Sequence, residues 1–259
     1  MTVLEVRPGV GDLLKAWRTK RRLSQFDLSL QADVSTRHLS YVETGKSKPS
    51  KDFVLHLAEH LDVPLRGRND LLVAAGYAPV YGETDLSDPV MQQVNHALDL
   101  VLSQQEPYPA IVVDRGWDLV RANDGAAVLL EGVDPSLLPN VMRLTLHPDG
   151  LAPRILGFEQ LAGHLVSRLK RQAALTGDDV LADLVAELSS YPGVPAQEPW
   201  TDHPGVVLPV RIRSSRGDLS FFTTAATFGT ASDVTLSELT VECFFPADQQ
   251  TRDALASRP

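Results

Sequence analysis

The chain has 259 residues, of which 43% are hydrophobic and 22% are charged. This is the composition of a soluble globular protein, not of a disordered one, and the length allows one large or two ordinary domains. No apolar run approaches the roughly 18 residues of a membrane span, and the first residues lack the apolar core of a signal peptide. We therefore expect a cytoplasmic protein with no membrane partner. The only cysteine, Cys243, excludes an internal disulfide and a thiolate metal cluster.

Charge is unevenly distributed along the chain. Residues 1–68 contain 12 Lys and Arg against 8 Asp and Glu, whereas residues 69–259 contain 12 against 25, so that the net charge is −9. A mildly basic segment before an acidic one is typical of a protein that binds nucleic acid at one end. The asymmetry alone is weak evidence, and it needs a supporting motif.

Five short helices are predicted in the first 75 residues. Apolar residues recur at helical spacing, as at Leu57, Ala58 and Leu61. Ser35 is a good N-cap, and Gly45 lies where a left-handed C-cap is expected. The expected helices span residues 10–22, 25–32 and 36–43, and the last two begin at Ser50 and Pro64. In the second helix we expect three apolar residues in or near the core, namely Phe26, Leu28 and Leu30.

The second and third of these helices form a helix-turn-helix. Only Asp33-Val34-Ser35 separates them, and two helices joined by so short a turn define this unit. The surrounding run, RLSQFDLSLQADVSTRHLSYVETGKSKPS, resembles the phage-repressor-like (XRE/Cro) helix-turn-helix family. The matching positions are Leu23-Ser24-Gln25, Val34-Ser35, Leu39-Ser40, Glu43-x-Gly45, Pro49-Ser50 and Leu57-Ala58…Leu61.

The resemblance implies that residues 36–43 form the recognition helix, whose N-terminal residues enter the major groove of DNA. The Arg37 side chain can form two hydrogen bonds to the edge of a guanine, and Thr36 can place its methyl group against that of a thymine. Gln25 resembles the family's phosphate-contacting glutamine, and the lysines after the helix would lie beside the DNA backbone. The expected DNA-binding residues are Gln25, Ser35, Thr36, Arg37, Ser40, Tyr41, Lys46 and Lys48. The expected partner is double-stranded DNA with an inverted-repeat operator, bound by a homodimer; His38 is either a surface residue or a contact.

The remaining residues predict a sheet covered by helices. Asp88 and Pro89 are suited to begin a helix that ends near Gln105. Its apolar stripe favours packing on its own domain over packing on a second subunit. Strands are expected at residues 110–114, 117–122, 206–213, 219–227 and 236–245, and helices at 123–130, 155–174 and 179–191. This order predicts an α+β domain with a five-stranded antiparallel sheet.

That order of elements resembles the PAS fold. More narrowly, three runs resemble the MmyB-like ligand-binding domain found behind this type of helix-turn-helix: EPYPAIVVDRGWDLVRAN, LSFFTTAATFGTASDVTLSEL and ECFFPAD. We therefore expect an all-α, five-helix DNA-binding domain at residues 1–77, a linker at 78–88 and a PAS-like domain at 89–259.

The resemblance implies a small hydrophobic ligand, fatty-acid-like in kind, and the apolar residues of the second domain are consistent with an apolar pocket. The expected ligand-binding residues are Trp117, Phe158, Leu165, Phe221, Phe222, Val241 and Phe245, although each of them is equally suited to fill the core. Arg154 and Arg211 either meet a carboxylate at the pocket mouth or lie on the surface.

Other chemistries receive little support. Flavin photochemistry needs a cysteine on a helix, whereas Cys243 lies in a predicted strand. Haem needs an axial ligand, and neither His147 nor His164 lies in a recognisable haem context. His203 is a further histidine without an evident partner, and no phosphate loop, paired-histidine metal spacing or nucleophile elbow is present. We expect no cofactor and no enzyme activity. The alternative to a ligand sensor is a second domain that only dimerises or docks a protein.

Overall fold

The computed structural model describes residues 8–196 and 207–256. It divides into a compact unit that contains the residues up to Glu83 and a second unit that contains most of the residues from Thr84 onward. The two-domain organisation expected from the sequence is therefore confirmed. None of the described helices is long and apolar enough to cross a membrane.

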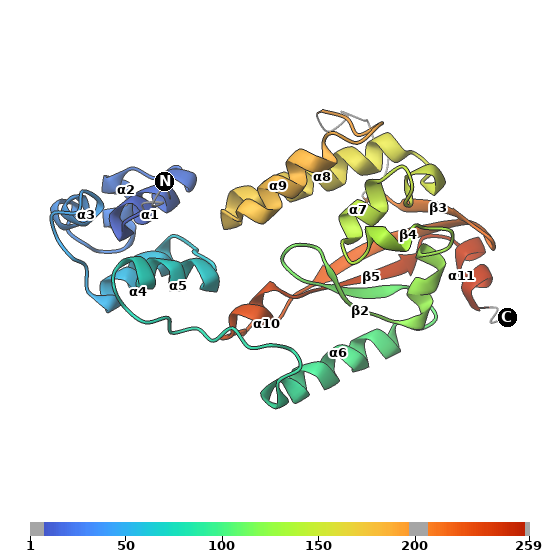
Figure 1. The fold of residues 1–259 in the computed structure, drawn as a ribbon, viewed down its shortest axis with the longest axis horizontal. Coiled ribbons are helices and arrows are strands. Elements are labelled where there is room, and N and C mark those ends of the chain that lie inside the picture. The colour runs from blue at the N-terminus through green and yellow to red at the C-terminus, as the bar shows by residue number, and fades with distance from the viewer. Residues whose placement is uncertain (1–7, 197–206, 257–259) are drawn as a thin grey trace, which may run out of the picture. The chain divides into compact units, whose positions relative to one another are not determined.

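The N-terminal unit consists of five helices, as predicted (Figure 1). They are α1 (Val10–Lys20), α2 (Gln25–Gln31), α3 (Thr36–Glu43), α4 (Lys51–His60) and α5 (Leu65–Ala74). Helix α1 ends earlier than expected because Arg22 adopts a left-handed conformation, with φ at 57°. Ser24, Ser35 and Ser50 each accept a hydrogen bond from a backbone N–H of the first helical turn. Gly45 has a φ of 70° and ends α3 as predicted.

One expectation for the core of this unit is wrong. Leu28 is fully buried, but Phe26 and Leu30 are 65% and 73% exposed. Successive residues of a helix are separated by about 100°, so residues two positions on either side of Leu28 point roughly away from it. With Leu28 directed into the core, Phe26 and Leu30 therefore point toward solvent.

The second unit is built on the predicted five-stranded antiparallel sheet. Its strands are β1 (Ala110–Val113), β2 (Leu119–Ala122), β3 (Val210–Ser214), β4 (Gly217–Ala226) and β5 (Thr240–Pro246), in the order β2-β1-β5-β4-β3. Helix α6 (Gln92–Gln104) lies on one face of the sheet. Three helices lie on the other face (Figure 1): α7 (Val141–Leu146), α8 (Phe158–Thr176) and α9 (Asp179–Leu188).

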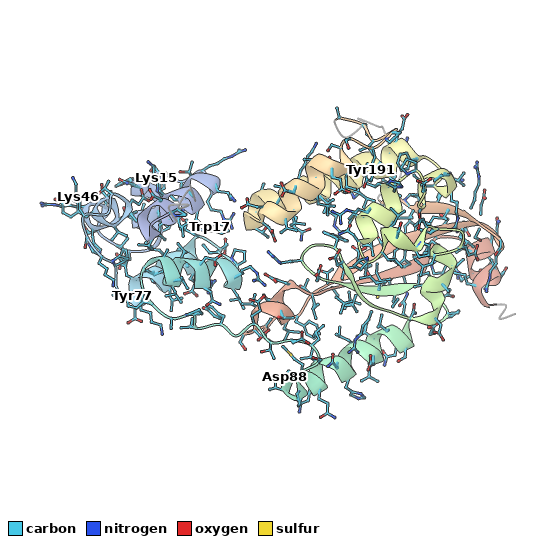
Figure 2. The ribbon with its side chains drawn as sticks, in the orientation of Figure 1. Lys15, Trp17, Lys46, Tyr77, Asp88 and Tyr191 are labelled. Carbon is cyan, nitrogen blue, oxygen red and sulfur yellow. The ribbon has the colours of Figure 1, made fainter. Side chains whose placement is uncertain are left out.

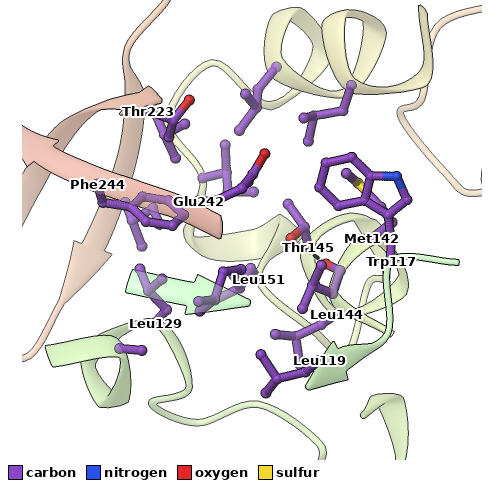
Figure 3. Close-up of a pocket in the computed structure, with 18 of the residues that line it drawn as sticks. Trp117, Leu119, Leu129, Met142, Leu144, Thr145, Leu151, Thr223, Glu242 and Phe244 are labelled. Atoms are coloured by element: carbon purple, nitrogen blue, oxygen red, sulfur yellow. Dashed lines mark hydrogen bonds between the residues drawn. The ribbon is translucent and has the colours of Figure 1, made fainter. Parts of the chain in front are cut away.

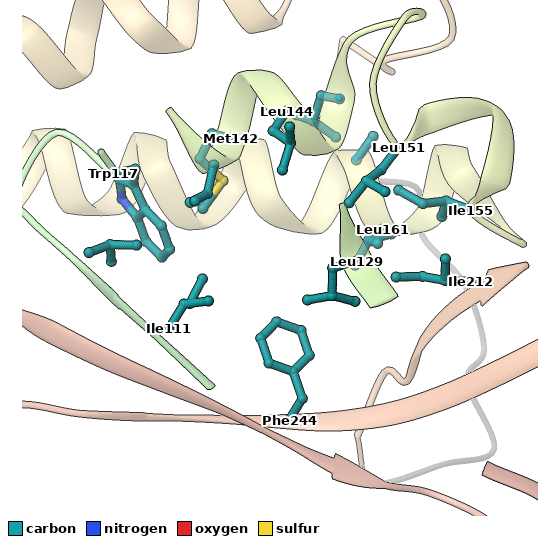
Figure 4. Packing of buried hydrophobic residues seen from close by; sticks show 14 of the residues in the cluster. Ile111, Trp117, Leu129, Met142, Leu144, Leu151, Ile155, Leu161, Ile212 and Phe244 are labelled. Atoms are coloured by element: carbon teal, nitrogen blue, oxygen red, sulfur yellow. The ribbon is translucent and has the colours of Figure 1, made fainter. Parts of the chain in front are cut away.

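The central strand β5 divides its side chains between these two layers. Val241 and Cys243 pack with Leu98 and other residues of α6. Phe244 belongs to the larger core cluster on the other face (Figure 4). Because consecutive side chains of a strand point to opposite faces, the even-numbered residues of β5 face helices α7 to α9. The expectation that α6 packs on its own domain is thus confirmed for its buried residues Leu98 and Leu102.

Several element boundaries differ from expectation. Helices α7, α10 (Val234–Glu238) and α11 (Gln249–Ala256) were not predicted, because runs of five to eight residues are too short to show a clear helical period. Helix α10 replaces the expected beginning of the last strand, and Gly157, with a φ of 76°, delays the beginning of α8. Short 3-10 helices form at Pro89–Met91, Asp124–Leu129, Pro135–Leu137 and Ala152–Arg154.

Candidate functional site

The recognition helix α3 is fixed at its beginning by serine side chains. The Ser35 hydroxyl accepts a hydrogen bond from the backbone N–H of His38, at 3.4 Å. The hydroxyl groups of Ser29 and Thr36 lie 2.6 Å apart and join α2 to α3. These contacts set the angle between the two helices at the end of α3 that would enter a groove.

A buried carboxylate holds the first three helices together. The Glu43 side chain is 1% exposed and accepts hydrogen bonds from Arg18 Nε at 2.7 Å and Arg18 Nη2 at 2.8 Å. Gln25 Nε2 donates a further bond of 2.7 Å to Glu43 Oε2. Burial raises the pKa of Glu43, but the bonds from Arg18 and Gln25 outweigh it, so that the pKa lies below its ordinary value.

This arrangement also gives Gln25 a contact within the protein. Its side-chain donor contacts Glu43 within the protein, and the residue is half-buried. Gln25 therefore links α2 to α3 in the structure, and part of the residue remains exposed. The sequence motif includes Glu43 but gives no sign of its partner, because Arg18 lies 25 positions earlier on another helix.

Four of the expected DNA-binding residues form an exposed group on and just after α3. Arg37 Nε donates to the Tyr41 hydroxyl at 3.0 Å, and its guanidinium lies 5.3 Å from the Tyr41 ring centre. Lys46, which is labelled in Figure 2, places its Nζ 5.9 Å from the same ring, so two cations lie near Tyr41. Thr36 is also exposed, at the first position of α3, where its hydroxyl contacts Ser29. Because a side chain that is already oriented loses less freedom on binding, this group is suited to contact a groove and its phosphates.

The remaining residues around α3 have mixed roles. Lys48 is exposed, and its Nζ lies 5.4 Å from the ring centre of Tyr77. Ser40 is half-buried, which limits its reach toward a base. His38 is also half-buried, and its ring packs edge-on against Phe53 at 4.7 Å, so it has at least a structural contact.

The second unit contains a cavity of about 550 Å³ between the sheet and helices α7 and α8 (Figure 3). Apolar residues make up most of its described lining. They are Ile111, Trp117, Leu119, Ala122, Ala126, Leu129, Leu130, Leu138, Val141, Met142, Leu144, Leu151, Ile155, Leu161, Leu165, Val207, Leu208, Val210, Ile212, Ala225 and Phe244. The polar residues of the described lining are Thr145, His164, Arg168, Thr223 and Glu242.

Trp117 forms one wall of this cavity. It has a φ of 66°, in a turn where Asp114 Oδ1 accepts hydrogen bonds from the backbone N–H groups of Gly116 and Asp118. This places Trp117 before β2, not within it as predicted. The indole Nε1 donates to Gln172 Oε1 at 3.0 Å. A backbone bond of 2.9 Å from the Val141 N–H to the Trp117 carbonyl attaches the beginning of α7 to the same turn.

Of the seven expected ligand-binding residues, Trp117 and Leu165 line the cavity. Phe158 packs at the edge of the core, where its ring occupies the space next to Gly193. Phe221 is fully buried and contacts Phe244 edge-on, with ring centres 5.9 Å apart. These two aromatic residues therefore fill the core, which was the alternative left open for each.

The other three expected residues lie on the opposite face of the sheet. Val241 packs with the cluster that contains α6, and Phe222 and Phe245 are paired across β4 and β5 with exposures of 39% and 41%. Assigning them to the cavity was wrong. Alternate residues of a strand point to opposite faces of the sheet, and these three point away from the cavity. Phe244 and Glu242 of β5, and Thr223 and Ala225 of β4, face the cavity instead.

Arg168 and Glu242 are the charged residues of the described lining, and they form an ion pair. Arg168 Nη2 lies 2.7 Å from Glu242 Oε1, and the Arg168 guanidinium lies 4.6 Å from the Trp117 ring centre. Figure 3 shows Glu242 pointing into the cavity between Phe244 and Trp117. Sequence reasoning missed both residues. The available signals were a single carboxylate within an apolar strand and an arginine seven positions after Leu161 on the same helix.

The two arginines considered as carboxylate contacts lie elsewhere. Arg154 donates to the backbone carbonyls of Val128, Glu131 and Arg213, and so joins β3 to a neighbouring segment. Arg211 is exposed on β3. Arg168, not either of these, is the arginine of the cavity lining.

The residues weighed for cofactor chemistry are also dispersed. Cys243 faces α6, and burial together with the charge of Glu242 raises the pKa of its thiol. His147 lies 3.6 Å from an Asp149 carboxylate oxygen, whereas His164 lines the cavity. His203 lies outside the described residues. Within the part of the chain that the structure describes, no group of three or more His, Cys, Asp or Glu is placed to hold a metal ion.

Two family models match the chain. Residues 94–257 match the MmyB-like transcription regulator ligand binding domain, which covers more than half of the chain. The chain belongs to the MmyB-like transcription regulators. Residues 14–67 match a helix-turn-helix model. No curated protein was found to match the chain. This MmyB-like protein is therefore a DNA-binding transcription regulator with a ligand-binding domain, and both resemblances seen in the sequence are confirmed.

The buried Glu43 makes a testable contribution to the stability of the DNA-binding domain. Glu43→Gln leaves the Arg18 charge buried without a counter-charge, so we expect the free energy of unfolding of this domain to fall by about 3 kcal/mol. Urea unfolding followed by far-ultraviolet circular dichroism measures the change. The control is Glu59→Gln on the exposed surface of α4, which should change it by less than about 0.5 kcal/mol.

The same pair predicts a dependence on pH. Because the pKa of Glu43 is lower in the folded state, its stabilising contribution is present above the ordinary glutamate pKa of about 4.3 and is lost as pH falls toward the folded value. The Glu43→Gln protein should therefore lose less stability over this range than the wild type. If the free energy of unfolding falls equally steeply with pH in both proteins, Glu43 is not the group responsible.

Proposed function

We propose that this MmyB-like regulator binds an inverted-repeat operator as a homodimer, and that uptake of a small hydrophobic ligand by its C-terminal cavity changes that affinity. The proposed domains are a DNA-binding domain at residues 1–77, a linker at 78–88 and a ligand-binding domain at 89–259. The protein acts in the cytoplasm by binding and not by catalysis. The observation that carries the ligand proposal is the apolar cavity of about 550 Å³.

The exposed group of Thr36, Arg37, Tyr41 and Lys46 supports the DNA contacts. Arg37 is exposed near the beginning of α3, the part of a recognition helix that reads base edges. Lys46 follows the helix, where phosphates of the adjacent backbone pass. A single domain of this size contacts few base pairs, which is the reason for proposing two copies on a two-fold symmetric site.

The cavity supports a ligand with a fatty-acid-like chain. Its volume falls within the roughly 300–1,000 Å³ of small-molecule sites, and leucine, isoleucine and valine side chains dominate its described walls. Moving an alkyl chain from water to such walls gains a free energy of about 0.8 kcal/mol per methylene group. The walls form few hydrogen bonds with a ligand.

One observation favours the alternative, a second domain that dimerises or docks a protein without a ligand. Phe222 and Phe245 form an exposed aromatic pair across β4 and β5. Exposed apolar patches are common at protein interfaces. This alternative leaves the cavity without a role, so we rank it second.

The DNA contacts can be separated by two substitutions. Arg37→Ala should relax base preference at one position of each half-site and cost roughly 1–3 kcal/mol per contact. Lys46→Ala should weaken binding to all sequences alike and reduce the salt dependence by about one ion per site. Fluorescence anisotropy with specific and random duplexes at several salt concentrations measures both. An equal loss of specific and random binding in Arg37→Ala would assign Arg37 to a phosphate instead.

The symmetry of the complex is tested by footprinting on the promoter of the protein's own operon. We expect two protected half-sites related by a two-fold axis, with centres about one helical turn apart. Sedimentation of the complex should give two chains per operator. A monomer bound with full affinity at one asymmetric site would refute the dimer.

The ligand proposal predicts that affinity rises with chain length. In a series of saturated fatty acids, each added methylene should tighten binding by about 0.8 kcal/mol, or about fourfold, until the cavity is full. Leu165→Trp narrows the cavity and should lower the chain length at which the series levels off. Leu100→Trp, on the exposed side of α6, is the control and should leave the series unchanged. A flat response at every length, with no lipid recovered from the denatured protein, would leave the docking alternative.

A further inference from the structure

The charged residues of the cavity lining balance one another. Arg168 projects from α8 and Glu242 from the central strand β5, and their side chains meet at 2.7 Å. The Glu242 side chain is only 10% exposed, so its carboxylate faces the cavity and not bulk water. One guanidinium thus already has one carboxylate as its counter-charge inside an apolar chamber.

This balance disfavours a second carboxylate. A fatty-acid head that reached Arg168 would also lie close to Glu242, and two neighbouring carboxylates in an apolar site repel each other. The repulsion is larger in the cavity than in water because the surrounding side chains screen charge weakly. His164, one turn before Arg168 on the same face of α8, is the other titratable residue of the described lining.

An uncharged polar head fits the pair better. An alcohol or a primary amide has both a donor and an acceptor. Its O–H or N–H can donate to the Glu242 carboxylate while its oxygen accepts from the Arg168 guanidinium. Each of these is a hydrogen bond to a charged group, which is stronger than a bond between neutral groups.

We infer that the Arg168–Glu242 pair makes the cavity select alkyl ligands with an uncharged hydrogen-bonding head, such as an alcohol or a primary amide, over free fatty acids. The inference rests on the proposed ligand function and names the head group that this function uses. Glu242 is the specificity-determining residue, because its charge is what excludes the carboxylate. The alkyl chain extends from the pair along the apolar walls.

The test compares one chain with three heads: decan-1-ol, decanamide and decanoate. Binding to the full-length protein is measured by tryptophan fluorescence, since Trp117 lies beside Arg168, at about pH 8, where a free carboxylic acid is ionised. The wild type should bind the alcohol and the amide about tenfold more tightly than decanoate. Glu242→Gln keeps the side-chain shape but removes the charge, so it should improve decanoate binding by about tenfold or more. Glu159→Gln, exposed in the first turn of α8, should leave all three affinities unchanged.

The outcomes separate the two levels of the proposal. If wild-type protein binds decanoate as tightly as the neutral compounds, the head-group inference is overturned while the alkyl-binding function stands; this comparison needs no variant to fold. If Glu242→Gln folds and leaves decanoate binding unchanged, Glu242 is not the excluding residue. If none of the three compounds binds, both the inference and the ligand function fail.

Discussion

The C-terminal domain is organised around a large apolar cavity that its own side chains do not fill. Its volume is about 550 Å³, and apolar residues make up most of its described lining. An alkyl chain bound there would leave water, at about 0.8 kcal/mol for each buried methylene group. A ligand that binds only the folded domain would stabilise that domain, and the proposed function depends on this coupling.

The same ion-pair chemistry serves two purposes in this protein. In the DNA-binding domain, Glu43 and Arg18 are enclosed, and Gln25 and the Leu23 carbonyl satisfy further bonding positions of the pair. Such a fully satisfied pair fixes the geometry of three helices. Glu242 and Arg168 instead line a cavity, where a ligand can reach them. The first pair orients the recognition helix, and the second gives polarity to a chamber that is otherwise apolar.

The fold was largely predictable because its signals are local. Serine caps at Ser24, Ser35 and Ser50, and Gly45 after α3, mark helix ends in the sequence itself. The order of strands and helices was sufficient to predict the five-stranded antiparallel sheet. Short elements such as α7 and α10 were missed, since one or two turns give no period to recognise.

The cavity residues were harder to predict for two reasons. It must be known which alternate residues of a strand face inward, and which residues far apart in the sequence contact each other. Strands β4 and β5 each contain two consecutive phenylalanines, and either one of a pair can face inward. The structure turns Phe221 and Phe244 inward, and leaves Phe222 and Phe245 half-exposed. The pairs Arg18–Glu43 and Arg168–Glu242 join residues on different elements, so nothing in either local sequence identifies the partner. The exposed tip of α3 was easier to locate, because the helix-turn-helix motif fixes its position.

The most direct test of a ligand-responsive regulator is a thermodynamic cycle on the full-length protein. The dissociation constant for operator DNA is measured with and without a saturating amount of the tightest-binding alkyl compound, and the constant for that compound is measured with and without operator. One ratio compares the operator dissociation constants with and without the compound, and the other compares the compound's constants with and without operator. Linkage requires these two ratios to be equal, and we predict a common change of about 5–150-fold in either direction. A compound that binds tightly while both ratios remain at one would contradict the account, because the cavity would then be filled without any effect on DNA binding.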